Sequence, residues 1–281
     1  MILIADSGST KTDWAFLENG KLISEFSSEG LNPYFLDESQ IFEIMTITFQ
    51  DFDRKTEVSD IFFYGAGCNS KITNSKIETE LKKLFIHAQI EVESDMLGVA
   101  RSVFAKKSGI AVILGTGSNS CLYDGTNITM QVGSFGYILG DEGSGSNIGK
   151  SFITSFLNNE LPSEISKLFY AEFKLDTTSI IESVYRNQFP NRYLASFTKF
   201  MAKNIENQSI KKIVKNSFRE LFSRKLSKYD LQNHEIAFVG SIAFHFSDIL
   251  KEVADEYNVT INQIEKTPMK GLMTFHASQS I

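Results

Sequence analysis

ILIADSGSTKTD occupies residues 2–13, and the apolar-rich WAFL follows at residues 14–17. The dipeptide Asn19-Gly20 comes next, and a further strand-like stretch covers residues 22–26. An apolar run, a turn rich in Gly, Ser and Thr, and a hairpin dipeptide predict three strands joined by two turns. The first of these turns is the one that bears on function.

That turn has the composition of a phosphate-binding loop. Gly8 lets the backbone approach a ligand closely, and backbone N–H groups in such a turn can hold phosphate oxygens. Its hydroxyls and amides come from Ser7, Ser9, Thr10 and Thr12. Asp6, at the end of the apolar run, could hold a metal ion that bridges the phosphates. A plain β-hairpin with a polar tip explains the same residues.

Composition limits the class of protein. The chain has 281 residues, more than one compact core usually holds, so we expect two domains. Hydrophobic residues make up 42% of it. The net charge is -6, and this negative charge argues against a surface that binds nucleic acid. Cys68 and Cys121 lack the spacing of a zinc site or a disulfide framework and fit a reducing compartment. Without a signal peptide or a membrane-length apolar run, we expect a cytoplasmic protein with no membrane partner.

Hydrophobic periodicity divides the rest of the chain into helices and strands. We expect helices at residues 39–51, 74–85, 96–104, 147–157 and 270–278, three more between 163 and 229, and one from 241 to about 257. Strands are expected at residues 61–67 (ending in a glycine turn), 90–92, 110–114, 120–123, 128–132, 235–239 and 259–264. This repeated order predicts an α/β fold with a mixed sheet and helices on its faces.

Residues 110–132 follow the same plan as residues 2–26. An apolar strand leads into GTGSN at residues 115–119, and two further strands and a glycine turn come after it. A third glycine turn, Gly240-Ser241, follows the apolar run at residues 235–239. Ligands of α/β folds lie at the carboxyl ends of strands, so three such turns indicate a nucleotide held from both sides.

These motifs carry a resemblance. DSGSTKTDW at residues 6–14, LGTGSN at 114–119, GDEGSG at 140–145 and VGS at 239–241 resemble the acetate and sugar kinase/Hsp70/actin superfamily. Within it, the chain is similar to the N-acetylglucosamine kinase branch of the BadF/BadG/BcrA/BcrD ATPase family. The resemblance covers almost the whole chain in order. Its specific part is GTGSN followed by GDEGS, since DxGxT alone is common.

The resemblance implies two ribonuclease-H-like (actin-like ATPase) domains with a cleft between them: residues 1–107, on which the terminal helix 268–281 packs back, and residues 108–267. ATP and Mg2+ would lie in the cleft beside an amino sugar. Thr10 would contact the β- and γ-phosphates, and Asp6 would orient hydrated Mg2+. The other nucleotide contacts would come from Gly8, Ser9, Lys11, Thr116 and Gly117, and on the adenosine side from Gly240 and Ser241. Phosphoryl transfer depends mostly on positioning and neutralised charge, which suits these groups.

Asp95 matches the place of the general base in this family, just after a strand of the first domain and at the start of a helix. A sugar hydroxyl needs a carboxylate within reach as the γ-phosphoryl group moves onto it. Considered without the family, Asp95 is more simply a helix-start acid that the helix dipole stabilises.

Asp141 and Glu142 lie between glycines, where a carboxylate can accept from two sugar hydroxyls at once. Acids are also common at the start of a helix. The resemblance assigns a sugar contact to Asp141 and leaves Glu142 as a supporting or capping residue. It assigns the other sugar contacts to Asn32, Asp95, Ser118, Asn119 and Gly136.

The resemblance implies an ATP-dependent sugar kinase, a phosphotransferase with an alcohol acceptor, that acts as a homodimer on an N-acetylated amino sugar. N-acetylglucosamine at its 6-hydroxyl is the first expectation. One alternative is an ATPase activator of a radical dehydratase, which needs an iron–sulfur cluster held by cysteine thiolates. Another is a non-catalytic sugar-sensing protein. The sequence does not separate N-acetylglucosamine from N-acetylmuramic acid, N-acetylmannosamine or glucosamine, because that choice depends on a few loop contacts.

Overall fold

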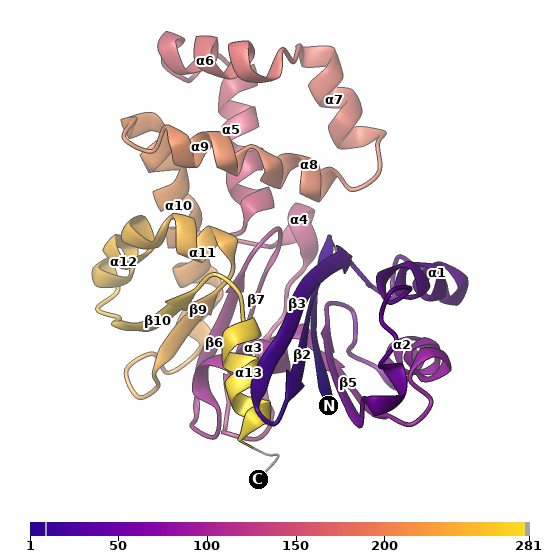
Figure 1. Ribbon diagram of the computed structural model, residues 1–281. Coiled ribbons are helices and arrows are strands. Elements are labelled where there is room, and N and C mark those ends of the chain that lie inside the picture. The colour runs from indigo at the N-terminus through magenta and orange to yellow at the C-terminus, as the bar shows by residue number, and fades with distance from the viewer. Residues whose placement is uncertain (9, 279–281) are drawn as a thin grey trace. The chain divides into compact units, whose positions relative to one another are not determined.

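The computed structural model describes residues 1–8 and 10–278, which group into two compact units. Unit 1 comprises Met1–Lys107, Tyr123–Ile128 and the residues from Thr267, and unit 2 comprises Ser108–Leu122 and Thr129–Lys266. Each unit is built around one five-stranded sheet with helices, so the predicted α/β class is confirmed (Figure 1).

The sheet of unit 1 has the strand order β3-β2-β1-β4-β5. Its strands are β1 (Ile2–Ser7), β2 (Lys11–Glu18), β3 (Lys21–Glu29), β4 (Asp60–Gly65) and β5 (Gln89–Ser94). The first three pair antiparallel, whereas β1, β4 and β5 run parallel. The predicted opening of strand, turn, strand, hairpin and strand is confirmed. The carboxyl ends of β1, β4 and β5 consequently lie at one edge of the sheet.

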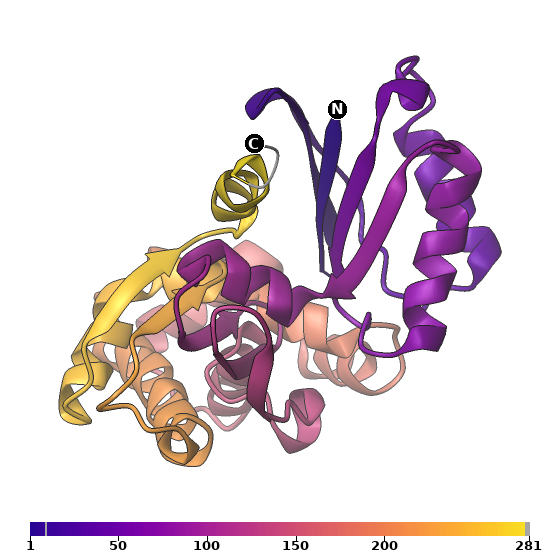
Figure 2. The same cartoon turned by 90° about the horizontal axis from the view of Figure 1, so that it is seen from below.

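Helices cover both faces of this sheet (Figure 2). They are α1 (Glu38–Thr48) and α2 (Lys71–Leu84) on one face, and α3 (Asp95–Phe104) and α13 (Met269–Ala277) on the other. Successive side chains of β1 point to opposite faces of the sheet, so this strand packs against both helix layers. Leu3 and Ala5 belong to the core that α1 and α2 complete, whereas Ile4 packs with Met269 and Leu272 of α13.

Capping residues set where the helices of unit 1 begin. Asp37 forms a capping box with Gln40 ahead of α1, and Ser70 forms one with Thr73 ahead of α2. Each box satisfies backbone N–H groups that the first helical turn leaves without partners. Helix α2 therefore begins three residues before the predicted residue 74, because the Ser70 cap lies outside the apolar periodicity.

The sheet of unit 2 repeats the plan of the first, with the strand order β10-β9-β6-β7-β8. Its strands are β6 (Gly109–Leu114), β7 (Ser118–Tyr123), β8 (Ile128–Val132), β9 (Ile236–Val239) and β10 (Ile261–Glu265). Strand β9 runs parallel to both β6 and β10. The expectation that the chain contains two copies of one architecture is thereby confirmed.

The helices of unit 2 depart from the prediction. They are α4 (Gly136–Leu139), α5 (Gly145–Leu157), α6 (Ser163–Phe173), α7 (Thr177–Tyr185), α8 (Pro190–Ser196), α9 (Thr198–Lys203), α10 (Gln208–Arg224), α11 (Ser241–His245) and α12 (Ser247–Glu256). The expectation of three helices between residues 163 and 229 is wrong, because five occupy that interval. The expected helix from residue 241 to about 257 is two helices that meet at Phe246.

A cluster of phenylalanines forms much of the core between α5, α6 and the α8–α9 pair. Phe169 contacts Phe152, Phe197 and Phe200 through edge or near-edge ring packing. These rings are fully or almost fully buried, as expected for the Phe-rich helices. Within the described residues, no helix has both the length and the apolar character needed to span a bilayer.

Candidate active site

The glycine turn of unit 1 joins the end of β1 to the start of β2. The N–H of Gly8 donates to the carbonyl oxygen of Lys11 at 2.9 Å and closes the turn. Gly8 and Thr10 are exposed. Among the described residues that are not its chain neighbours, a Cβ at Gly8 would meet only the Lys11 carbonyl oxygen, at 3.6 Å, an ordinary van der Waals contact. Ser9 lies outside the described residues.

Two hydroxyls of this stretch are buried and hold the loop after β3. Ser7 and Thr12 are fully buried, and their hydroxyl oxygens lie 2.7 Å apart. The N–H of Leu31 donates to both oxygens, at 3.1 and 3.2 Å. These two hydroxyls therefore bond the loop after β3.

Carboxylates gather at the carboxyl edge of the first sheet. Asp6 and Asp13 are paired in register on β1 and β2, so their side chains share a face. Burial raises the pKa of Asp6 to about 7. The charges of Asp95 and Asp13 act in the same direction, whereas that of Lys11 opposes them. Lys11 Nζ lies 2.7 Å from Asp13 Oδ1.

This donor set fits a hydrated magnesium ion. Mg2+ at phosphate sites keeps several waters and uses one or two carboxylates, so it needs no cage of protein ligands. Among the described residues no group of three or more His, Cys, Asp or Glu side chains is arranged to hold a metal ion. Asp6, with Asp13 beside it, remains the candidate.

Asp95 is the first residue of α3 and follows β5 directly. Ser94 caps the helix by accepting from the N–H of Leu97, and Asp95 Oδ1 accepts from the N–H of Met96 at 2.8 Å. Burial raises the pKa of Asp95 to about 6, although the Met96 N–H acts to lower it. A carboxylate with a pKa near neutrality is suited to accept a proton from an alcohol.

Asn32 lies in the loop after β3 and is 6% exposed. Its Oδ1 accepts from the N–H of Tyr34 at 3.0 Å. Gly67 has φ +85, and a Cβ there would stand only 2.8 Å from the Tyr34 ring and also meet the Asn32 amide oxygen. Gly67, which the sequence analysis did not assign, therefore lets the loop after β4 pack on Asn32. The signal was the Gly-Ala-Gly sequence after the apolar run.

The glycine turn of unit 2 is fastened to the start of α5. Gly115 O accepts from the N–H of Gly145 at 2.8 Å, and Thr116 O accepts from the N–H of Ser146 at 3.0 Å. Apart from its chain neighbours, no described residue has an atom within 4 Å of where a Cβ at Gly115 would stand. The turn thus presents open backbone while α5 holds its carbonyl groups.

Asp141 is buried beside this turn in an unusual backbone conformation. Its φ is +59, which a residue other than glycine seldom adopts. Asp141 Oδ1 accepts from the Ser134 hydroxyl at 2.5 Å and lies 3.4 Å from the N–H of Ser118. A Cβ at Gly117 would stand 3.1 Å from Asp141 Oδ2. Gly117, Ser118 and Asp141 are thus brought together within unit 2.

Two further residues predicted to touch the sugar, Asn119 and Gly136, lie close to this group in the chain. Asn119 Oδ1 accepts from Gln131 Nε2 at 3.1 Å, which ties β7 to β8. Gly136 is the first residue of α4 and has φ +73. In the described part of the chain, only its own neighbours in sequence could lie within 4 Å of a Cβ there.

Glu142 does not cap α5, because Ser144 does so by accepting from the N–H of Asn147. Glu142 is 5% exposed. Its Oε1 lies 3.6 Å from Arg224 Nη1 at the end of α10, and its Oε2 lies 3.6 Å from Nζ of the next residue, Lys225. Lys225 Nζ also donates to Gly133 O at 2.7 Å. Lys225 therefore ties the 133–136 loop to Glu142, a role that sequence reasoning missed.

Gly240 has a structural role at the end of β9. Its φ is +130, and a Cβ there would overlap the carbonyl oxygen of Leu114. Its N–H donates to Glu265 O at 2.9 Å, so Gly240 lies where β6, β9 and β10 end. Ser241 begins α11 and is exposed.

The cysteines do not resemble ligands of an iron–sulfur cluster. Cys68 belongs to unit 1 and Cys121 to unit 2, and both are buried. Burial raises the pKa of Cys68 to about 12, which disfavours the thiolate that a cluster needs. This counts against the dehydratase-activator alternative.

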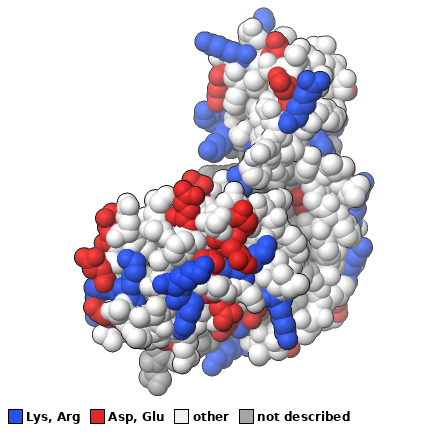
Figure 3. All heavy atoms as spheres, turned by 90° about the vertical axis from the view of Figure 1, so that its right-hand side faces the viewer, with Lys and Arg blue, Asp and Glu red and all other residues white. Residues whose placement is uncertain are grey.

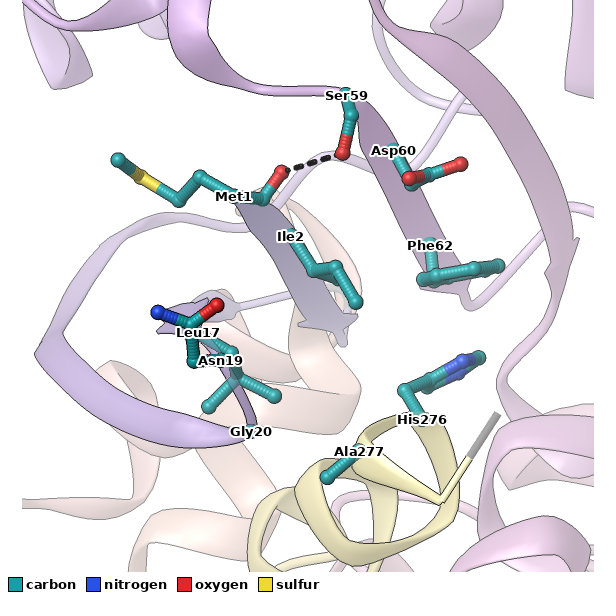
Figure 4. A pocket seen from close by; sticks show the side chains of 10 residues that line it. All are labelled: Met1, Ile2, Leu17, Asn19, Gly20, Ser59, Asp60, Phe62, His276 and Ala277. Atoms are coloured by element: carbon teal, nitrogen blue, oxygen red, sulfur yellow. Dashed lines mark hydrogen bonds between the residues drawn. The ribbon is translucent and has the colours of Figure 1, made fainter. Parts of the chain in front are cut away.

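A cavity of about 770 Å³ in unit 1 lies away from these residues (Figure 4). Its lining includes Ile2 and Asp60, which begin β1 and β4, and the ring of Phe62 stacked on His276 of α13 at 3.7 Å. Ligands of α/β folds bind at the carboxyl ends of strands, so this cavity at the opposite ends is not the candidate active site.

The comparisons with known proteins agree on the class of protein. A crystal structure of a protein from Porphyromonas gingivalis, provisionally named an N-acetylglucosamine kinase, is 38% identical, covers 100% of both chains and has a TM-score of 0.95. The N-acetylmuramic acid/N-acetylglucosamine kinase of Clostridium acetobutylicum is 26% identical over 233 residues, which are 79% of this chain and 76% of that protein.

A more distant structure shares the fold alone. It is a ROK family glucokinase from Streptomyces griseus in complex with glucose and AMPPNP, with 12% identity and a TM-score of 0.59 over 99% of this chain and 98% of that one. No family model matches the chain. The full-length match confirms the predicted two-domain sugar kinase fold, and the chain belongs to the N-acetylglucosamine kinase family of sugar kinases.

Proposed function

We propose that this protein transfers the γ-phosphoryl group of ATP to an N-acetylated amino sugar, with N-acetylglucosamine and its 6-hydroxyl as the first choice. The observation that carries the proposal is Asp95, whose pKa is raised to about 6 at the edge of the sheet that also carries the Gly8 turn. The names of the Porphyromonas and Clostridium relatives support the same reaction.

In the proposed reaction, Asp95 accepts the proton of the sugar hydroxyl. The hydroxyl oxygen then forms a bond to the γ-phosphorus as the bond to the ADP oxygen breaks. Bound Mg2+, held by Asp6 with Asp13 nearby, would neutralise charge on the phosphates. AMPPNP in the Streptomyces griseus structure supports ATP as the donor.

We assign the remaining groups by their positions in the two turns and loops. The phosphates would meet Gly8, Ser9, Thr10, Lys11, Thr116 and Gly117, and the adenosine would meet Gly240 and Ser241. The sugar would meet Asn32, Ser118, Asn119, Gly136 and Asp141. The open space beside Gly115 and Gly136, and the room for a Cβ at Gly8, support backbone contacts with a ligand at these places.

The finer classification is also a proposal. The DSGSTKTDW, GTGSN and GDEGSG motifs support the BadF/BadG/BcrA/BcrD branch. The two units support domains at residues 1–107 with 268–281, and at 108–267; residues 279–281 lie outside the described part of the chain. We further propose a cytoplasmic homodimer that binds no nucleic acid. The net charge of -6 supports the last point. On the one face that Figure 3 shows, basic and acidic side chains are interspersed.

A coupled assay of ADP release over a panel of sugars tests the proposal. We expect turnover with N-acetylglucosamine, and 31P NMR of the product should place the phosphate on the 6-hydroxyl. Turnover with N-acetylmuramic acid as well would match the name of the Clostridium relative. A folded protein that binds the sugar but releases no ADP would be the non-catalytic sensor, and the proposal would be wrong.

A further inference from the structure

A buried pair of hydroxyls joins the first glycine turn to the loop that carries Asn32. Ser7 ends β1, Thr12 lies at the start of β2, and the two residues are partners in the antiparallel register. Alternation along the strands directs their side chains to the face opposite that of Asp6 and Asp13. Both hydroxyls are fully buried, and their oxygens are 2.7 Å apart.

The hydrogen bonds of the Ser7–Thr12 pair must continue to a carbonyl group of the neighbouring backbone. Each hydroxyl has one proton, and the 2.7 Å contact uses one of the two. The other proton is left for a carbonyl: Thr12 Oγ1 lies 3.1 Å from Glu29 O, and Ser7 Oγ lies 3.3 Å from Leu31 O. In either arrangement a directed chain of hydrogen bonds leads from the turn into residues 29–31.

Backbone N–H groups of the same segment donate further hydrogen bonds to the turn and to the two hydroxyls. The N–H of Gly30 donates to Thr10 O at 3.1 Å, and the N–H of Leu31 donates to both hydroxyl oxygens. The next residue is Asn32, whose side chain is held by the N–H of Tyr34. The turn and Asn32 are therefore linked through these hydrogen bonds to residues 29–31 and through the peptide bond that joins Leu31 to Asn32.

We propose that Ser7 and Thr12 are positioning residues that couple ATP binding at the turn to sugar binding at Asn32, so that each substrate raises the affinity for the other. The inference rests on the proposed function, which places the phosphates at Thr10 and the sugar at Asn32. A phosphate that fixes the turn also fixes residues 29–31, so less ordering remains when the sugar binds. Such coupling is reciprocal by linkage.

Calorimetry measures the coupling directly. N-acetylglucosamine is titrated into the protein with and without AMPPNP and Mg2+, and the ratio of the two affinities is the coupling factor. For the wild type we expect a factor of at least about 5. Thr12→Val keeps the shape but removes one hydroxyl and should reduce the factor, and Ser7→Ala/Thr12→Val should bring it close to one. Thr12→Ser restores a hydroxyl and should keep the wild-type factor.

Thr198→Val is the matched control. Thr198 is a buried threonine of unit 2 whose hydroxyl donates to Ala195 O, in its own unit, at 2.6 Å. Its loss should lower stability and leave the coupling factor unchanged. Steady-state kinetics supply a second readout. The variants that lose the coupling, Thr12→Val and Ser7→Ala/Thr12→Val, should raise the KM for the sugar more than they lower kcat.

The outcomes separate the two proposals. A wild type that turns over N-acetylglucosamine but shows no coupling, or a folded double variant with the full factor, overturns the role of Ser7 and Thr12 alone. A wild type that releases no ADP with any sugar overturns the proposed function, and this inference with it. If the double variant does not fold, equal factors in Thr12→Val and Thr12→Ser overturn the inference.

Discussion

Replacing Asp95 by asparagine keeps the shape of the side chain and removes the proton acceptor. The amide oxygen can still accept from the N–H of Met96, which now lies 2.8 Å from Asp95 Oδ1. Helix α3 should therefore begin at the same residue, and the sugar should still bind. Turnover should fall by roughly 10² or more, the usual contribution of a positioned base. The KM for the sugar should change much less, since the lost interaction belongs to the transition state.

The raised pKa adds a signature in the pH profile. With a pKa of about 6, Asp95 is ionised above that pH and neutral below it. At saturating Mg2+, kcat/KM of the wild type should be about tenfold lower at pH 5 than at pH 8, because only about a tenth of the base is ionised. The Asp95→Asn protein should lack this acidic limb.

The raised pKa of Asp95 also predicts that the Asp95→Asn variant unfolds less readily than the wild type above pH 6. A carboxyl whose pKa is raised from 3.8 to about 6 on folding costs the native state at most about 3 kcal/mol at neutral pH. The cost is absent below pH 3.8, grows between 3.8 and about 6, and is complete above that range. Asp95→Asn should remove it, so the variant should be more stable than the wild type at pH 8 and equally stable at pH 3.5.

Steady-state kinetics and urea unfolding at the two pH values provide the measurements. A helix-start acid without a catalytic role would give nearly normal turnover and a loss of stability of at most about 1 kcal/mol. Near-normal turnover of folded Asp95→Asn protein would refute the assignment of the base, and with it most of the proposed mechanism.

Three further predictions concern the two turns and the strand ends. Protons compete with Mg2+ for Asp6, whose pKa is raised to about 7; apparent Mg2+ affinity should be about tenfold weaker at pH 6 than at pH 8, and equal values would contradict this. Gly117→Val would push on Asp141 Oδ2, 3.1 Å from the position of a Cβ, and should lower calorimetric ATP affinity at least about tenfold; unchanged affinity would remove the turn from the site. Gly240→Ala would overlap the Leu114 carbonyl at φ +130 and should cost about 2 kcal/mol or more in urea unfolding; a cost below about 0.5 kcal/mol would contradict it.

Local patterns were enough to predict the strands of both sheets. At β1, β4, β6 and β9 an apolar run followed by a glycine turn marks the end of a buried strand. They failed between residues 163 and 229. There α8 and α9 meet at Phe197 without a glycine or proline between them, so the break leaves no signal in the sequence. That break accounts for one of the two helices that the prediction lacked.

The candidate site was predictable to different degrees. Strict alternation from Asp6 would have placed Ser7 and Thr12 on the opposite face, so their burial could have been predicted. The positive φ of Asp141 could not, because tertiary packing holds it there against its local preference. The contact between Gly67 and Asn32 joins two loops that are distant in sequence. The Gly-Ala-Gly sequence indicates a turn at Gly67 but does not indicate which loop packs on it.

The packing of α13 on unit 1 has a consequence for the order of folding during synthesis. The face formed by Ile4, Leu17 and Tyr64 is completed by Met269 and Leu272. Residues 269–277 leave the ribosome only after all of unit 2 has been made. Domains usually fold in the order of their synthesis, but here the unit that is begun first must wait for the last helix. A nascent chain of residues 1–107 should expose this apolar face and need protection from aggregation, whereas unit 2 can mature while it is still attached to the ribosome.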